Sequence, residues 1–492
     1  MQPKLNIYKA VLILSLCLVL AFIFQYIQLR YQLCHSYSPD IRGQEKNVVY
    51  GIQQTMDHIS NLYRPIDAPP FAFVQYTPIY YFVCAGICKI LGMAPGQDVI
   101  QIYFTCRLLN LILNIGSCAL LFFLLYKLLD TNWIISSLTV ALFLLSSQSH
   151  TWAIRPDALK NVFFLLSITY FIKWITLEKT NWGILSTLFS ALAIFTKQDM
   201  VSLPIGLLIY LWFSADKKSF YLYFTYIFGF ALIGIIIFSL IYGTSIWENL
   251  FWAVNNGASI QTAENIIVGY SGSYIYLIPW GLYAAISGLF QKNTEIEKLL
   301  ALLIVVLFGF GCLAASKSGS LISYFNETNT VIFISMASLA SRESKKYLHI
   351  LLLTSCLSLC MLFQILSSYK PEMERLRISE EKNCYKIQYD ECTAIGQYLK
   401  TKLRPNENIY TNDPFLKNIL FDHILIPMDD IVLFNRMAGT FDSVPYSNYF
   451  KQRKIKYAVF KQSDPLQDII GQQFENFIPI KSVGSYIIYQ QP

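Results

Sequence analysis

The stretch IYYFVCAGICKILGM, residues 79–93, decides how this chain is threaded through a membrane. It is apolar, but it is shorter than the roughly 20 residues that a helix needs to cross a bilayer. Pro78 opens it, and Gly86 and Lys89 interrupt it. We therefore predict that it lies at the interface or re-enters, and that Arg30–Tyr103 forms one long external loop with an embedded helix.

The distribution of lysine and arginine tests this threading independently, because cytoplasmic loops carry an excess of both. If residues 79–93 do not cross, the connection Gly243–Ser273, which has no Lys or Arg, is external. If they did cross, the clusters at Lys217-Lys218 and Arg342–Lys346 would be external instead. We therefore place the amino terminus in the cytoplasm, on the side of these loop residues: Lys4, Lys9, Lys127, Lys179, Lys217, Lys218, Lys292, Lys298, Arg342, Lys345 and Lys346.

Composition indicates a polytopic membrane protein. The chain has 492 residues, of which 54% are hydrophobic and 14% charged, and its mean hydropathy is +0.43. The net charge of +7 partly reflects the basic cytoplasmic loops, so we do not expect a nucleic-acid partner. The apolar run Ala10–Phe24 continues toward Leu29 without a small-residue cleavage site, which predicts an uncleaved first helix.

Ten further apolar runs follow the first helix, so we predict about eleven spans in a plasma (inner) membrane. An odd number of spans places the carboxyl terminus outside, on the side of the long first loop. The ten runs are Phe104–Tyr126, Trp133–Ser147, Leu159–Ile175, Gly183–Phe195, Val201–Phe213, Tyr221–Tyr242, Tyr274–Phe290, Leu299–Ala315, Thr328–Ala340 and Leu348–Leu366.

From Ser367 onward, charged residues become frequent and apolar runs shorten. We predict a transmembrane domain over residues 1–366 and a small external α/β domain over residues 367–492. Cys384 and Cys392 lie in the external part, where disulfides persist; a bridge and two free thiols are both open. The predicted elements are helices at Glu391–Leu403 and Pro445–Arg453, and strands at Asn408–Thr411, Lys456–Phe460 and Ser485–Tyr489.

Charged residues are nearly absent from the middles of the spans and gather at their external ends. Three compact polar clusters lie between apolar runs, at Trp152–Asp157, Thr196–Asp199 and Tyr324–Glu327. They fall on the same predicted side as Asp40 and Glu45 of the first loop, together with Arg64. Arg107 and Lys317 also lie at these ends, and we interpret them as ordinary loop charges.

Carboxylates and cations gathered at the external interface suit the transfer of a sugar from a polyprenyl phosphate, whose tail lies in lipid and whose sugar lies in water. A carboxylate takes the proton of the acceptor hydroxyl. Cations hold the phosphate and stabilise its charge as it leaves. The acceptor stays open between a glycan, a lipid and a protein side chain.

Several motifs follow one another in a specific order. An acidic first loop is followed by Pro69-Pro70, Tyr76-Thr77-Pro78-Ile79-Tyr80-Tyr81, Cys106-Arg107-Leu108-Leu109, Arg155-Pro156-Asp157, Thr196-Lys197-Gln198-Asp199 and Ser323-Tyr324-Phe325-Asn326-Glu327. This order resembles the GT-C superfamily of glycosyltransferases, in the branch that holds protein O-mannosyltransferases, aminoarabinose transferases and many bacterial lipid-linked-sugar transferases. The resemblance implies a helical membrane fold with interfacial helices in its first external loop, and an inverting enzyme that uses a polyprenyl-phosphate sugar donor.

The resemblance also implies roles for single residues. The family has an adjacent Asp-Glu pair in the first loop, whereas here Asp40 and Glu45 are five residues apart, so the catalytic base stays open between them. Asp157 matches the acid of the second external loop. No cofactor and no metal are expected. The residues expected to bind the donor phosphate or substrate are Arg64, Arg155, Lys197, Tyr324 and Glu327.

Simpler interpretations exist for several of these residues. Asp157 follows Pro156 and could cap a helix, Lys197 could extend from a span end to the interface, and the aromatics of Tyr76–Tyr81 could form an interfacial belt. For the whole chain, one alternative is a lipid or glycan transporter or flippase, which predicts a repeated half and broken spans. Another is a polysaccharide ligase or polymerase that relies on external Arg and His.

Overall fold

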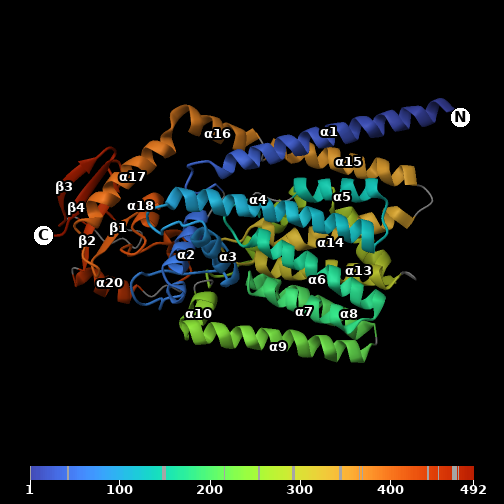
Figure 1. Ribbon diagram of the computed structural model, residues 1–492, viewed down its shortest axis with the longest axis horizontal. Helices are drawn as coiled ribbons and strands as arrows, with labels where there is room; N and C mark the ends of the chain where they lie inside the picture. Colours follow the sequence, from blue (N-terminus) through green and yellow to red (C-terminus); the bar gives the residue numbers. More distant parts are fainter. Residues whose placement is uncertain are drawn as a thin grey trace.

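The computed structural model describes residues 2–41, 44–146, 151–214, 216–252, 255–290, 294–342, 346–364, 366–367, 370–439, 443–452, 454–467, 474 and 476–492. The predicted cytoplasmic residues Lys292 and Lys345, and the end of the predicted helix at Arg453, lie outside these ranges. The molecule is elongated, with a helical bundle at one end and a small α/β unit at the other (Figure 1).

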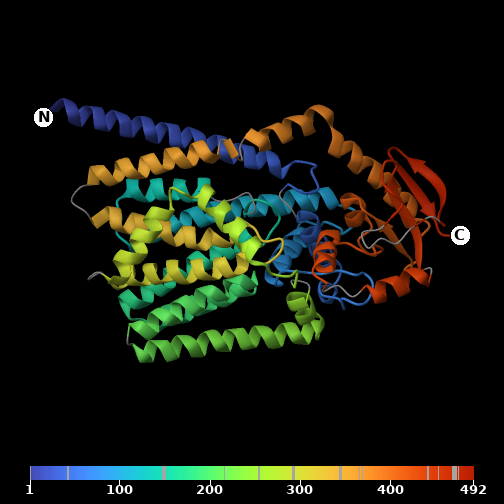
Figure 2. The ribbon, with the colours of Figure 1, turned by 180° about the vertical axis from the view of Figure 1, so that it is seen from behind.

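Long helices run side by side along the long axis of the bundle (Figures 1 and 2). Each of the eleven predicted runs contains a helix, and most boundaries differ by a few residues from the prediction. The helices are α1 (Gln2–Cys34), α4 (Val99–Phe123), α5 (Trp133–Ser146), α6 (Asp157–Leu177), α7 (Thr180–Ile194), α8 (Ser202–Phe213), α9 (Lys217–Tyr242), α12 (Ile278–Phe290), α13 (Glu295–Ala315), α14 (Asn326–Arg342) and α15 (Lys346–Gln364).

Among the described residues, four helices are long and apolar enough to cross a membrane, namely α4 with its π-helical extension, α6, α9 and α13. The pair α11 (Ile260–Ser273) and α12, bent by 98°, makes a fifth if it counts as one span. The predicted number of eleven is therefore not confirmed, because several apolar helices, such as α5 and α7, have only 14 and 15 residues. Helix α11 was not predicted, and it lies in the stretch Gly243–Ser273 that we expected to be a plain connection.

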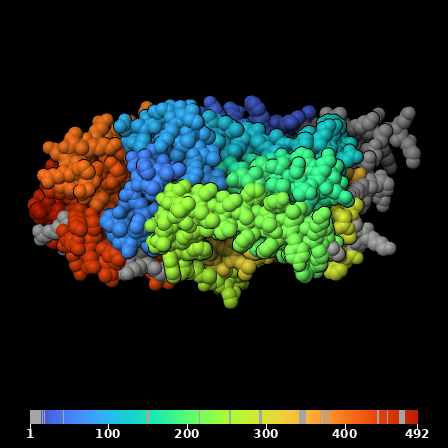
Figure 3. Space-filling view, turned by 60° about the horizontal axis from the view of Figure 1, so that its bottom comes forward, coloured from blue at the N-terminus to red at the C-terminus, as the bar shows by residue number. Residues whose placement is uncertain are grey.

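Helix α9 lies at the edge of the bundle, and its green surface faces the viewer in Figure 3. Only 11% of the most apolar 18-residue stretch of α9 is buried. Large apolar side chains such as Phe228 (59% exposed) and Leu240 (82% exposed) point outward. Such a continuous apolar face is stable in lipid but not in water. We infer that α9 faces the hydrocarbon of the membrane.

The predicted first loop contains helices α2 (Glu45–Asp57) and α3 (Ile79–Ile90), with a short 3-10 turn at Ile59–Asn61. Helix α3 forms where an embedded helix was expected, has 12 residues, and packs against α2. Both lie at the end of the bundle that faces the α/β unit (Figure 1). The aromatics Tyr80 and Tyr81 are fully buried there, so they are core residues and not an interfacial belt.

The carboxyl-terminal part is an α/β unit, as predicted. Its four-stranded sheet has the order β1-β2-β4-β3, with β1 parallel to β2 and the other neighbours antiparallel. Strand β3, which contains Pro479, was not predicted. The elements are α16 (Lys370–Lys382), α17 (Cys384–Lys400), β1 (Asn408–Thr411), α18 (Pro414–Ile419), α19 (Asp429–Met437), α20 (Val444–Lys451), β2 (Ile455–Lys461), β3 (Ile478–Val483) and β4 (Tyr486–Gln490).

No disulfide joins Cys384 and Cys392. Both thiols are free, with Cys384 exposed and Cys392 buried. They lie on the same helix, α17, eight residues apart, which separates their Cα atoms by about 12 Å along the axis. A disulfide requires Cα atoms within about 7 Å, so the alternative with two free thiols is correct.

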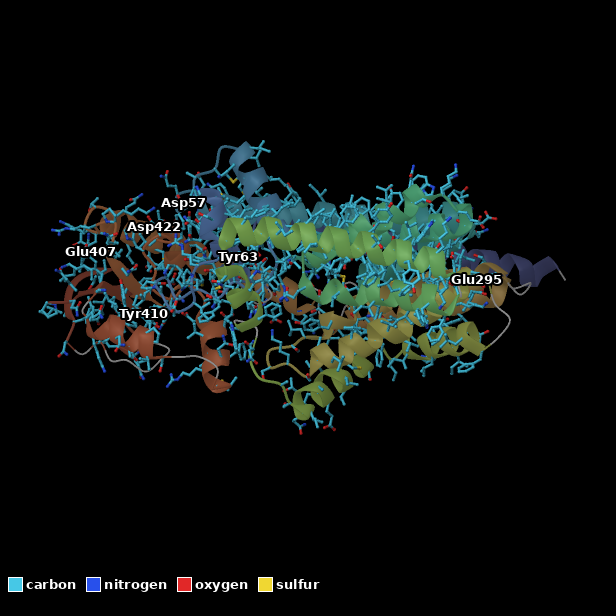
Figure 4. All side chains as sticks on the ribbon, turned by 90° about the horizontal axis from the view of Figure 1, so that it is seen from below. Asp57, Tyr63, Glu295, Glu407, Tyr410 and Asp422 are labelled. Atoms are coloured by element: carbon cyan, nitrogen blue, oxygen red, sulfur yellow. The ribbon has the colours of Figure 1, made fainter. Side chains whose placement is uncertain are left out.

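The first loop and the α/β unit share one hydrophobic core. Buried residues of α2 and α3, such as Ile52 and Cys84, belong to the same cluster as Ile409 and Val459 of the sheet. A separate cluster fills the bundle. In Figure 4, Asp57 at the end of α2 lies near Asp422 of the α/β unit, while Glu295 lies at the opposite end of the molecule. The α/β unit therefore holds the first loop in place.

Candidate active site

Six charged side chains meet where the bundle faces the first loop, and we call them the charge network. They come from three segments that are far apart in the sequence: the start of α6, the turn between α7 and α8, and the first turn of α14. Each segment is a polar cluster between two apolar runs, so helix packing alone brings the three ends together. The members are Arg155, Asp157, Lys160, Lys197, Asp199 and Glu327.

The network contains three cations and three carboxylates. Lys197 Nζ lies 2.9 Å from Asp157 Oδ1 and 3.2 Å from Asp199 Oδ2. Lys160 Nζ lies 2.8 Å from Glu327 Oε1 and 3.4 Å from Asp199 Oδ2. Arg155 Nε lies 3.3 Å from Asp157 Oδ2. The charges balance within the network, which lets so many ionised groups remain buried.

These contacts decide between the alternative interpretations of Asp157 and Lys197. Asp157 begins α6, where a carboxylate is favoured by the helix dipole, but its side chain is fully buried among Arg155, Lys160 and Lys197. Lys197 is buried as well and does not extend to an interface. Burial alone would lower the pKa of Lys197, but the carboxylates of Asp157 and Asp199 outweigh it and hold the pKa well above its usual range.

Two cavities meet at the network. The polar cavity has a volume of about 240 Å³, and its lining includes Tyr76, Arg155, Lys197, Asp199 and Lys317. The apolar cavity has a volume of about 230 Å³, and its lining includes Met200, Val201, Leu307, Phe310 and Leu313. Asp199, Ala314 and Tyr324 line both cavities. A polar chamber and an apolar chamber therefore share one wall.

Lys317 is the cation of the polar cavity that lies outside the charge network. Within the described part of the chain, no carboxylate oxygen lies within ion-pair distance of its amine. Burial and the nearby charge of Lys197 lower the pKa of Lys317 to about 8. Our interpretation of Lys317 as an ordinary loop charge is wrong, because it lines the cavity.

In the first loop, Glu45 is completely buried and all of its acceptor positions are used. Its carboxylate accepts hydrogen bonds from Arg107 Nη2 at 2.7 Å and Nε at 3.3 Å, and from the backbone N–H groups of Ile41 and Ile154 at 2.8 Å. Arg107 also donates to the carbonyls of Ser36 and Ser38. Arg107 is therefore buried and holds the loop, which corrects our interpretation of it as a loop charge.

Asp40 has a different environment. It is half-buried, and its carboxylate accepts from two backbone N–H groups, those of Gln44 at 2.9 Å and Glu45 at 3.4 Å. No cationic side chain lies within ion-pair distance of it among the described residues. Burial, and then the charge of Glu45, raises the pKa of Asp40 to about 6. Gln44, which holds it, lines the polar cavity.

Part of this site was predicted from the sequence. Arg155, Lys197 and Tyr324 line the polar cavity, Glu327 lines the apolar one, and Asp157 lies directly behind them. Asp40, Glu45 and Arg64 are not among the lining residues of either cavity, and Arg64 donates instead to Gln54 of α2. Lys160 was missed, although a lysine three residues into an apolar helix is itself a signal of function.

A metal site is not evident in the described residues, which contain no group of three His, Cys, Asp or Glu side chains arranged to hold an ion. The three carboxylates that gather there, Asp157, Asp199 and Glu327, pair with the three cations Arg155, Lys160 and Lys197.

Solved structures with the same architecture exist. ArnT from Cupriavidus metallidurans, solved bound to undecaprenyl phosphate, is 9% identical with a TM-score of 0.61, over 96% of this chain and 97% of that one. The oligosaccharyltransferase of Archaeoglobus fulgidus, solved with zinc and sulfate, is 10% identical with a TM-score of 0.54, over 92% of this chain and 68% of that one. AglB of the same archaeon, solved with an inhibitory peptide and a dolichol-phosphate, is 10% identical with a TM-score of 0.53, over 94% and 70%.

No family model matches the chain, and no curated protein sequence matches it. At about 10% identity, the structural likeness concerns the fold alone. The chain shares the fold of ArnT and of the archaeal oligosaccharyltransferase, and this shared fold agrees with the resemblance inferred from the sequence motifs. The chain is a helical membrane protein with this shared fold and a small carboxyl-terminal α/β unit.

Proposed function

We propose that this protein is a glycosyltransferase that moves a sugar from a polyprenyl-phosphate carrier to an acceptor hydroxyl at the external face of the membrane. One observation carries the proposal: a cationic polar cavity and an apolar cavity share the wall formed by Asp199, Ala314 and Tyr324. A prenyl-phosphate sugar has matching halves, since its chain is apolar and its phosphate and sugar are polar. ArnT and AglB, which share the fold, were solved with lipid phosphates.

Charge supports a phosphate in the polar cavity. The charge network is neutral as a whole, so Lys317 leaves the site with one uncompensated positive charge. A sugar phosphodiester carries one negative charge and would balance it. Arg155, Lys197 and Lys317 line the cavity and supply the donors for charge-assisted hydrogen bonds to phosphate oxygens.

Asp199 is placed to hold the sugar. Its Oδ2 contacts both network lysines, while its Oδ1 is buried without a hydrogen-bond partner among the described residues. A buried acceptor without a partner costs free energy, about 1–3 kcal/mol, unless a ligand donates to it. A sugar hydroxyl is such a donor.

Asp40 is our candidate for the base. In a single displacement, the acceptor oxygen forms a bond to the anomeric carbon while the bond from that carbon to the phosphate oxygen breaks. The acceptor proton moves to the carboxylate, and the phosphate leaves on its lipid, stabilised by the cations. One such step inverts the anomeric carbon. Glu45 suits this role less, because Arg107 and two backbone N–H groups occupy its oxygens.

A transfer assay tests the proposal. The purified chain in proteoliposomes is given a panel of radiolabelled sugars on polyprenyl phosphate, with and without EDTA, and in parallel the nucleotide sugars. We expect label to reach an acceptor only from the lipid-linked donors, and to do so in chelator. Transfer from a nucleotide sugar alone would contradict the proposal, whereas loss of activity in EDTA would contradict only its metal-free part.

The external placement has its own test, because it rests on the Lys/Arg asymmetry. Single cysteines replace Lys217 and Asp430 in a cysteine-free background, in intact cells. The proposed topology predicts that an impermeant thiol reagent labels position 430 and not position 217. The reverse pattern would contradict it.

A further inference from the structure

A third cavity, of about 290 Å³, lies against the segment that carries Asp40. It is enclosed by the end of α1, the turn that follows it, α16 and the start of α17. We call it the α16 cavity. Its lining is Leu33, Ser36, Ser38, Ile41, Arg375, Ile378, Ser379, Cys384 and Tyr385. The residues described so far for the donor site do not include any of these side chains.

The position of this cavity relates it to the proposed base. Ser38 and Ile41 line the α16 cavity, whereas Gln44 lines the polar cavity. Asp40 lies between them in the chain, with its backbone carbonyl held by Ser38 Oγ and its carboxylate held by the N–H of Gln44. Asp40 itself lines neither cavity, so the two cavities are related to the proposed base through these chain neighbours.

The lining combines apolar and polar side chains, which is the combination that an amphiphilic ligand needs. Leu33, Ile41 and Ile378 are apolar, and Ile378 is 43% exposed. The other side chains are three serines, a thiol and a phenol, together with Arg375, which is the only charged residue in the lining. Arg375 Nη1 donates to the carbonyl of Ile41 at 3.2 Å. Among the described residues, the other N–H groups of this guanidinium have no recorded partner, so they are available to an anion.

The helices around the α16 cavity suggest how a lipid could reach it from the membrane. Helix α16 crosses above the end of α1 where α1 leaves the bundle, as both ribbon views show (Figures 1 and 2). One apolar residue of the lining, Ile378, is itself exposed, and Tyr31 (51% exposed) on α1 and Ile387 (53% exposed) on α17 are exposed apolar residues on the same helices as the lining residues Leu33 and Tyr385. Exposed apolar side chains on neighbouring helices favour contact with lipid.

We propose that the α16 cavity binds the acceptor, and that this acceptor is a membrane-anchored amphiphile with an apolar chain, a hydroxyl and an anionic group that pairs with Arg375. This inference rests on the proposed function and names the acceptor class that it leaves open. A water-soluble acceptor, such as a free glycan or an unanchored peptide, would leave the apolar side chains of Leu33, Ile41 and Ile378 without a partner.

Cys384 provides a native probe, because it lines the cavity and its thiol is free and exposed. The full-length protein in phosphatidylcholine nanodiscs is treated with a water-soluble maleimide, and alkylation of Cys384 is followed by peptide mapping. The ligands are lysophosphatidic acid, inorganic phosphate and a serine-containing peptide. We expect lysophosphatidic acid to slow alkylation about tenfold at saturation, and the other two ligands to leave it unchanged.

Arg377 gives a matched control, since it lies on the same helix but is 70% exposed, pairs with Glu381 and does not line the cavity. Arg375→Gln should raise, about tenfold, the mole fraction of lysophosphatidic acid that halves the alkylation rate of Cys384, because a charge-assisted hydrogen bond is lost. Arg377→Gln should change this mole fraction less than twofold. Ser379→Phe, which fills the cavity without changing charge, should abolish protection.

Three outcomes would overturn the inference: no protection by lysophosphatidic acid, equal protection by inorganic phosphate or the peptide, or equal behaviour of the two arginine variants. The probe does not need the donor, so its failure is separate from failure of the proposed function. If Cys384 is protected as expected but the protein transfers no sugar from a lipid phosphate, the cavity binds an anionic amphiphile and its role as acceptor site is wrong.

Discussion

The charge network around Asp157 and the turn that holds Asp40 both present carboxylates at the same end of the bundle, but in opposite states. Asp157 is fully buried and contacts three cations. Asp40 is half-buried and is held by two backbone N–H groups alone. A carboxylate neutralised by cations binds and positions, whereas one without a cation retains its affinity for a proton. The contrast assigns binding to the first region and proton transfer to the second.

The largest effect on the rate of transfer is expected from substitution of Asp40. Asp40→Asn removes the base and should lower the rate of transfer by ~10²–10⁴-fold. Because Asp40 is half-buried in a polar turn, expression and donor binding should stay close to those of the parent protein. The turnover of Asp40→Asn is compared with that of Glu45→Gln at equal protein level. Equal rates in the two variants would contradict the assignment of the base to Asp40.

Substitution of Glu45 should lower the stability of the protein more than it affects the proton transfer itself. Glu45→Gln leaves Arg107 buried without its counter-charge, which costs roughly 3–5 kcal/mol in the free energy of unfolding. Thermal unfolding in detergent checks this, with Arg107→Gln and the double variant completing a cycle. We expect the double variant to be less destabilised than the sum of the two single ones. Strict additivity would mean that the pair does not hold the turn.

The pH profile of transfer should reflect the raised pKa of Asp40. Burial and the charge of Glu45 place this pKa at about 6. The protonated carboxyl cannot accept the acceptor proton, so the rate should be maximal above pH 6 and fall about tenfold for each pH unit below it. An acid limb with a midpoint near pH 4, the ordinary value for Asp, would contradict the environment described for Asp40.

The smallest effect concerns the free cation of the polar cavity. Lys317→Gln should weaken binding of undecaprenyl phosphate about tenfold, because one charge-assisted hydrogen bond is lost. In the parent protein, affinity should fall as the pH rises past about 8, where Lys317 loses its proton, and the variant should lack this step. Titration with the lipid phosphate at pH 7 and pH 9 measures both.

The sequence predicted the elements of this site better than their partners. The clusters ending in Asp157, Asp199 and Glu327 were visible because polar residues between two apolar runs mark span ends, and packed spans bring such ends together. Arg107 was misjudged because its partner, Glu45, lies 62 residues away. Lys317 was likewise misjudged, because its place in the lining of the polar cavity is set by the fold and not by its neighbours in the sequence.

The fold shows a similar division. Helices with long apolar runs, such as α9, were located to within a few residues, because burial in lipid dictates their composition. Helix α11 was missed since polar residues, Gly269 and Gly272 interrupt its apolar ones. Strand β3 was missed because Pro479 interrupts the pattern of a strand. The number of spans depends on how short helices are seated in the membrane, which composition does not determine.

Separate measurement of donor binding and sugar transfer tests the central claim most directly. The parent protein, Asp40→Asn and Asp157→Asn are compared in proteoliposomes for the dissociation constant of undecaprenyl phosphate and for single-turnover transfer. We predict that Asp40→Asn binds like the parent and fails to transfer, while Asp157→Asn binds weakly because Arg155 and Lys197 lose their shared anchor. Near-parent transfer by Asp40→Asn, by Glu45→Gln and by the double variant at equal expression would contradict the assignment of the base to this turn.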